Sequence, residues 1–160
     1  MRSDERTAHD LLEFGADCAA IDCRGRTPLH YAAGARSQVC VALLLDAGAS
    51  GSAIDDLGAS PLYYAARLPS DQEGLLRCLF SHGADFNCRF RYGGWTPAHA
   101  ACATENHTNL KTLIDLGADF RLSDNWGNTP LQIAVFKENV EAVLCLVSHG
   151  ASTDSADQLG

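Results

Sequence analysis

The sequence predicts an all-α solenoid in which four full helix-turn-helix repeats follow a partial repeat at the N-terminus. The dipeptide Gly-Ala recurs with spacings of 33, 35, 34 and 33 residues, at Gly15, Gly48, Gly83, Gly117 and Gly150. A second dipeptide, Thr-Pro or Ser-Pro, recurs with spacings of 33, 36 and 33 residues, at Thr27, Ser60, Thr96 and Thr129. Two markers that share one period indicate stacked repeats, because a single helix pair cannot bury its apolar face alone.

These markers divide the chain into consecutive units. A partial repeat that lacks a Thr-Pro marker comes first, and a short polar tail comes last. The expected boundaries are 1–21 for the partial repeat, 22–54, 55–88, 89–122 and 123–154 for repeats 1 to 4, and 155–160 for the tail.

The first helix of each repeat is expected to begin at the Thr-Pro or Ser-Pro marker. In repeat 1, Thr27 is a favourable N-cap residue, and Pro28 suits the first helical position because an N–H there has no helical partner. Small residues follow, among them Ala32 and Ala33, and they allow a neighbouring helix to approach closely. We therefore expect a row of short, closely packed helices.

The second helix of each repeat is expected to bury apolar residues seven, four and three positions before the Gly-Ala glycine, since these positions share one helical face. The glycine then ends the helix in the left-handed conformation. The expected buried residues are Val41, Leu44 and Leu45 in repeat 1, Leu76, Leu79 and Phe80 in repeat 2, Leu110, Leu113 and Ile114 in repeat 3, and Val143, Leu146 and Val147 in repeat 4.

The segment Thr27–Ala33 has the sequence Thr-Pro-Leu-His-Tyr-Ala-Ala. It resembles the signature of the ankyrin repeat family, Thr-Pro-Leu-His-x-Ala-Ala, and related segments begin at the other three markers. This resemblance implies helix pairs joined by β-hairpin or turn fingers beside a concave face. It implies that His30 and His99 bond backbone groups of neighbouring repeats. Members of this family bind many unrelated partners. We expect no enzyme, because the sequence has no nucleophile–base arrangement, phosphate-binding glycine loop or metal-ligand spacing.

The composition and net charge of the chain limit the kinds of partner and compartment that we expect. Apolar residues make up 46% of the 160 residues and the net charge is −8, so a folded chain is expected and nucleic acid is disfavoured. The charge suits a basic partner, or it serves solubility alone. No stretch is apolar enough to insert into a membrane. Seven dispersed cysteines without a Cys-x-x-Cys pair favour a reducing compartment, the cytoplasm or the nucleus. We expect a monomer without metal or cofactor.

The connector between repeats 2 and 3 differs from the other connectors. Residues 88–95 are one residue longer than their equivalents and are both basic and aromatic. Tryptophan, tyrosine and arginine dominate binding hot spots. Local packing of the two tryptophans is the alternative, and stacking of unpaired bases on them is disfavoured by the net charge. The predicted partner-binding residues are Arg89, Phe90, Arg91, Tyr92, Trp95, Trp126, Phe136 and Lys137.

Two smaller features complete the sequence analysis. Repeat 2 carries two extra residues within 68–74, a length that a surface loop tolerates. The family resemblance also implies that an asparaginyl hydroxylase could modify Asn87, because Leu79 lies eight residues before it and Asp85 two residues before it.

The sequence therefore predicts a non-catalytic scaffold or adaptor that binds a partner protein through its concave face and fingers, chiefly those of repeats 3 and 4. The alternative is the substrate-recognition array of a larger ubiquitin-ligase receptor or signalling enzyme.

Overall fold

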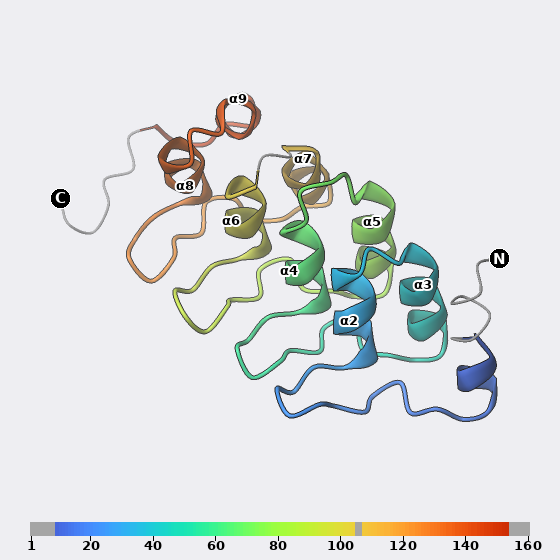
Figure 1. The fold of residues 1–160 in the computed structure, drawn as a ribbon. Coiled ribbons are helices and arrows are strands. Elements are labelled where there is room, and N and C mark those ends of the chain that lie inside the picture. The colour runs from blue at the N-terminus through green and yellow to red at the C-terminus, as the bar shows by residue number, and fades with distance from the viewer. Residues whose placement is uncertain (1–8, 105–106, 154–160) are drawn as a thin grey trace.

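The helices form two rows that run side by side through the molecule (Figure 1). A computed structural model describes residues 9–104 and 107–153, so part of the expected partial repeat and the tail 155–160 lie outside the described residues. The inner row holds α2 (Pro28–Gly34), α4 (Pro61–Ala66), α6 (Pro97–Cys102) and α8 (Pro130–Phe136). The outer row holds α3 (Gln38–Asp46), α5 (Glu73–Ser81), α7 (His107–Asp115) and α9 (Val140–Ser148).

Each helix packs against its partner in the same repeat and against the next helix in its row. A further helical segment, residues 9–13, precedes the first pair where the description begins. Within residues 9–104 and 107–153 no segment is a β-strand, so the predicted all-α solenoid is confirmed. None of the helices in those ranges has the length and apolar character that crossing a membrane requires.

The inner helices begin as the markers predict. Thr27 is extended and Pro28 is the first helical residue. The backbone N–H of Thr27 donates to Nδ1 of His30 at 3.1 Å, so histidine completes a capping box, a role that glutamate usually has. At the other side of the ring, Nε2 lies 3.0 Å from the carbonyl oxygen of Ala59 in the next repeat.

His99 repeats this arrangement in repeat 3, with Nδ1 at Thr96 and Nε2 3.0 Å from the carbonyl oxygen of Asn128. Both histidines are buried, and burial lowers the pKa of each. The predicted role of these two side chains, a bond between one repeat and the next, is confirmed. In repeat 4, Gln132 replaces the histidine and accepts from the Thr129 N–H at 2.7 Å.

The outer helices end in the left-handed turn that the Gly-Ala marker predicts. The glycine of all five Gly-Ala pairs has a φ between 78° and 97°, a region in which a side chain would be strained. The backbone N–H of each following alanine then bonds back to the helix, as in Ala84 to the carbonyl of Leu79.

The core lies between the two rows, and the expected outer-helix pattern is right at two of its three positions. Residues seven and four before the glycine are buried, apart from the half-buried Val143. Three positions before the glycine, however, Phe80 is 45% exposed and Val147 is 44% exposed, which corrects the prediction for these two residues. Phe80 leans outward onto Phe86 of the following turn, and Val147 lines an open hollow at the far end of α9.

In repeats 2 and 3 the loop between the inner and outer helices is fixed by an asparagine from the following repeat. The buried Asn109 donates to the carbonyls of Leu68 and Ser70 and accepts from the Gln72 N–H at 2.8 Å. These bonds hold the longer loop of repeat 2 in place. Asn139 donates to the carbonyl of Cys102 at the end of α6 and to that of Thr104 in the loop.

Candidate functional site

Four loops, which we call fingers 1 to 4 (residues 22–26, 55–59, 88–95 and 124–128), project from the inner row (Figure 1). In fingers 1, 2 and 4 an aspartate five residues before the Thr or Ser marker closes the turn: Asp22, Asp55 and Asp124. One carboxylate oxygen accepts two backbone N–H groups, which for Asp124 belong to Trp126 and Asn128, both at 2.9 Å. Fingers 1, 2 and 4 are thus turns held by a side chain, and the described residues of all four fingers form no β-hairpin ladder. The recurring aspartate was a sequence signal that we did not use.

Finger 3 is one residue longer, and Phe90 holds the place of this aspartate, seven residues after the Gly-Ala glycine. The Phe90 ring stacks on Tyr63, with 5.2 Å between ring centroids and 7° between the ring planes. Tyr63 is buried and occupies the position that His30 and His99 hold in repeats 1 and 3. Repeat 2 has therefore lost the bridging histidine and finger 3 the aspartate, and an aromatic pair joins these repeats instead. Phe90 is half-buried and contributes to packing.

The two tryptophans lie in different environments. Trp95 is half-buried against the core, its indole N–H donates to Asp124 Oδ2 at 3.3 Å, and its ring stacks over His99. Trp126 is 62% exposed. Its ring crosses Gly93, where an added Cβ would lie 2.7 Å from Trp126 Cζ3 and where φ is +107°. Local packing therefore describes Trp95, whereas Trp126 presents its ring to solvent.

The remaining residues of finger 3 also include one that is tied to its neighbours and two whose side chains are exposed. Arg89 Nη1 donates to the carbonyl of Ser123 at 2.9 Å and so ties finger 3 to the next finger. Arg91 is exposed, with its backbone N–H bonded to the carbonyl of Leu57. Tyr92 is 70% exposed and touches Phe90 through its ring edge.

A pocket of about 340 Å³ lies between finger 4 and α8, and we call it the aromatic pocket. It brings together four of the eight predicted partner-binding residues, from three separate parts of the chain. Phe136 is 79% exposed, and Lys137 Nζ lies 5.4 Å from the centre of its ring. The lining residues are Trp95, Asp124, Trp126, Asn128, Gln132, Ile133, Phe136 and Lys137. Arg89, Phe90, Arg91 and Tyr92 are not among them.

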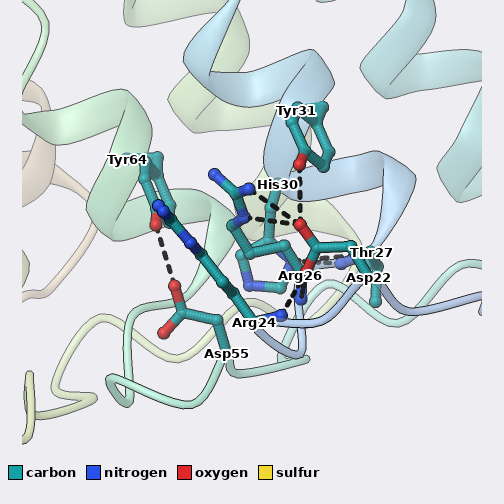
Figure 2. A network of polar contacts seen from close by, with 8 residues as sticks. All are labelled: Asp22, Arg24, Arg26, Thr27, His30, Tyr31, Asp55 and Tyr64. Carbon is teal, nitrogen blue, oxygen red and sulfur yellow. Dashed lines mark hydrogen bonds and ion pairs between the residues drawn. The ribbon is translucent and has the colours of Figure 1, made fainter.

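The equivalent place in repeat 1 holds a polar network (Figure 2). Asp22 Oδ2 accepts from the Tyr31 hydroxyl at 2.7 Å and from Nε and Nη2 of Arg26 at 3.0 and 2.7 Å. These bonds, first that of Tyr31 and then those of Arg26, hold the pKa of Asp22 well below its usual range. The hydroxyl of Tyr64 donates in the same manner to Asp55 at 2.8 Å.

A second pocket, which we call the polar pocket, lies beside this network and has a volume of about 330 Å³. Its lining residues are Arg26, His30, Tyr31, Gly34, Ala35 and Tyr64. Sequence analysis did not assign it. The signal that could have found it is a tyrosine nine residues after the finger aspartate, which occurs in repeats 1 and 2.

Asn87, the predicted hydroxylation site, is exposed in the turn after α5. Its Oδ1 accepts from the Asp119 N–H at 3.1 Å, and Leu79 is fully buried. The side chain thus links two successive turns, and its modification stays a prediction.

Two further features bear on metal binding and on thiol reactivity: a group of potential ligands near residue 9 and the buried Cys102. Among the residues that the structure describes, His9, Asp10 and Glu13 are the group that brings three potential ligand atoms within 4.8 Å. His9 lies 3.9 Å from the Asp10 carboxylate and 3.8 Å from the Glu13 carboxylate, and exposed groups commonly lie this close without a metal. Burial raises the pKa of the Cys102 thiol, which disfavours the reactive thiolate.

Comparisons with known proteins agree with this architecture. A family model described as ankyrin repeats (3 copies) matches residues 2–90 and 71–157. The chain is similar to potassium channel AKT1 of Arabidopsis thaliana, with 38% identity over 100% of this chain and 18% of the channel. It is also similar to human Rabankyrin-5, with 34% identity over 96% of this chain and 10% of that protein.

A third relative is the human neurogenic locus notch homolog protein 2, with 33% identity over 94% of this chain and 5% of that protein. The chain thus spans less than a fifth of the length of each of these three relatives.

Proposed function

The chain belongs to the ankyrin repeat family, and on this premise we propose that it binds a segment of another protein in the groove between its fingers and its inner helices. Ankyrin repeats are in general non-catalytic protein–protein interaction modules. The proposal places the main anchor of the partner in the aromatic pocket, between finger 4 and α8.

Exposed aromatic residues around one hollow carry this proposal. Trp126 and Phe136 are 62% and 79% exposed, although burial of such rings is strongly favourable in water. Neither ring position is required by the repeat, because the equivalent positions are Leu57 in finger 2 and Gly34 in α2. Two large rings that line one pocket are typical of an anchor site for an apolar side chain of a partner.

The eight predicted residues take two roles under this proposal. Arg91, Tyr92, Trp126, Phe136 and Lys137 contact the partner, because their side chains are exposed. The other three position the fingers: Arg89 through the Ser123 carbonyl, Phe90 through Tyr63, and Trp95 through Asp124.

The test starts from peptides selected on the protein itself. Random peptides of about 12 residues, displayed on phage, are panned against the immobilised chain, and the enriched peptides are measured by calorimetry. The variant that combines Trp126→Ala with Phe136→Ala should weaken their binding about tenfold or more, which corresponds to about 1.4 kcal/mol. Both residues are exposed, so we expect the free energy of unfolding to stay within about 0.5 kcal/mol per substitution.

The matched control combines Phe14→Ala with Leu144→Ala. Both residues are exposed and apolar, and neither lines the aromatic pocket. Equal weakening by the control and the pocket variant, or full binding by the pocket variant, would refute the aromatic pocket as the anchor site.

A second candidate function is that of a substrate-recognition array within a larger ubiquitin-ligase receptor or signalling enzyme. It is supported by the relatives, in which the matching segment is 5% to 18% of the whole protein. Sequencing of the full transcript tests it, because this function requires a catalytic or recruiting domain in the same reading frame. A transcript that encodes ankyrin repeats alone would exclude it.

A further inference from the structure

The negative charge of the molecule is unevenly distributed. The finger and inner-helix segments, residues 22–36, 55–68, 89–103 and 122–138, hold seven basic and five acidic residues. The other residues that the structure describes hold three basic and ten acidic residues. The proposed binding groove is therefore the basic side of an acidic protein.

Three of the five acidic residues on this side are used by the fold. Asp22, Asp55 and Asp124 accept backbone N–H groups that close the fingers. Asp22 is in addition paired with Arg26. Asp56 and Glu138 are the two exposed carboxylates that remain in these segments. The three finger carboxylates are thus oriented inward by backbone bonds, and the charge of Asp22 is compensated by that of Arg26.

The basic side chains, in contrast, are mostly available. Arg24, Arg67, Arg91 and Lys137 are exposed, and within the described part of the chain none of them forms an ion pair. Arg67 lies over the Tyr63 ring at 5.9 Å and Lys137 over the Phe136 ring at 5.4 Å. An aromatic ring orients a cation without neutralising it, so both can still bind a carboxylate.

From this placement we propose that the bound segment is acidic. It is an extended peptide whose carboxylates pair with Arg67, Arg91 and Lys137 and whose apolar side chain occupies the aromatic pocket. The inference rests on the proposed function and specifies the chemistry of the partner. It reverses the expectation from net charge alone, under which a net charge of −8 suits a basic partner.

Charge also distinguishes an acidic peptide from nucleic acid. A nucleic acid strand carries a charge at every phosphate and continues past the groove, where the carboxylates of the outer row repel it. A short acidic segment ends within the basic side. The groove therefore favours a protein segment, and single-stranded RNA becomes an outcome of the test.

The experiment compares three pools of labelled peptides of about 16 residues by fluorescence anisotropy. All pools have the same mixture of Leu, Phe, Trp and Met at the centre, with flanks of Asp and Glu, of Lys and Arg, or of Ser and Gly. The acidic pool should bind at least about tenfold more tightly than the basic pool at about 50 mM NaCl. This preference should shrink at about 300 mM NaCl, because salt screens exposed charges.

Two double variants test whether the preference for acidic peptides depends on the charges of the groove. Arg67→Glu with Lys137→Glu reverses two charges in the groove, and Arg77→Glu with Lys111→Glu reverses two exposed charges on the outer helices α5 and α7. Both change the net charge of the chain equally. The groove variant should weaken the acidic pool about tenfold and the outer variant by less than about twofold. Circular dichroism melting curves establish that both variants fold.

The outcomes separate the two proposals. Equal binding of all three pools would overturn the proposal that the partner is acidic, and the aromatic pocket would remain the proposed anchor site. Failure of every pool to bind would overturn both proposals. An equal loss in the two double variants would show a general charge effect and overturn the basic groove. Tighter binding of a uridine oligonucleotide than of the acidic pool would assign the groove to nucleic acid.

Discussion

The polar pocket of repeat 1 and the aromatic pocket of repeat 4 are lined by equivalent positions of their own inner helices and differ in almost every side chain. Tyr64 of the following repeat completes the first, and Trp95 of the preceding repeat completes the second. Tyr31, Gly34 and Ala35 in the first correspond to Ile133, Phe136 and Lys137 in the second. The volumes are nearly equal, about 330 and 340 Å³. In the first pocket the polar side chains are bonded to the finger aspartates Asp22 and Asp55, whereas in the second two large rings face solvent. The repeat sets where a pocket lies, and its side chains decide whether polar bonds or exposed rings line it.

The largest expected effect is a difference in stability between variants of the two tryptophans that line the aromatic pocket. Trp95→Ala should lower the free energy of unfolding by about 3 kcal/mol, because the half-buried ring and its bond to Asp124 are both lost. Trp126→Ala should change it by less than about 0.5 kcal/mol. Urea titration followed by circular dichroism measures both. If the two values were equal, the division between a packing and a binding tryptophan would be wrong.

The next effect tests the junction between the two halves of the array. Phe90→Ala should cost about 2 kcal/mol, since it removes the ring that stacks on the buried Tyr63. Tyr92→Ala is the control, because its ring is 70% exposed, and should cost less than about 0.5 kcal/mol. A small loss for Phe90→Ala would indicate that the stack does not stabilise this junction.

A smaller effect concerns the two bridging histidines, His30 in repeat 1 and His99 in repeat 3, and their response to pH. His30 and His99 have lowered pKa values because they are buried, so below pH about 6.5 the unfolded chain binds protons that the native chain does not. Stability should therefore be complete above that pH and should decrease as the pH falls through it.

Gln132 suggests the matching variant, because glutamine already completes the capping box of repeat 4. His30→Gln with His99→Gln should cost about 1 kcal/mol per site at pH about 8. The same variant should flatten the decrease below pH about 6.5, as melting curves across the pH range would show. An unchanged slope would mean that other groups cause the decrease.

The smallest effect concerns the turn that holds Asn87. Asn87→Ala should cost about 0.5 to 1 kcal/mol, because it removes an exposed side-chain bond to the Asp119 N–H. Ser52→Ala, at the equivalent position of repeat 1, should cost less. Mass spectrometry of the Asn87 peptide from cells tests the hydroxylation prediction, and a peptide without added oxygen would contradict it.

Local signals in the sequence were sufficient to predict the repeat. The caps, the closing glycines and the bridging His30 and His99 each depend on residues within one unit and on the period that stacks the units. The aromatic pocket was partly predictable, because Trp126 and Phe136 are unusual at their repeat positions.

The roles of Phe90 and Trp95 could not be predicted in this way. Each depends on a partner 27 or 29 residues away, Tyr63 and Asp124, and the Tyr63–Phe90 pair occurs at one junction only. Exposure of Phe80 and Val147 was missed for a related reason: helical spacing defines a face and does not say how far the neighbouring repeat covers it.

The Tyr63–Phe90 stack also bears on the mechanics of the array. Elsewhere His30 and His99 lie within bonding distance of a carbonyl oxygen, and a hydrogen bond is directional, so it resists sliding and rotation of one repeat on the next. Stacked rings resist separation but tolerate lateral displacement. On the outer side of the same junction the buried Asn109 bonds the carbonyls of Leu68 and Ser70, so we expect lateral displacement between repeats 2 and 3 to be confined to the inner-helix side. A partner that contacts the fingers of both repeats would then be able to adjust the curvature of the inner row at this junction.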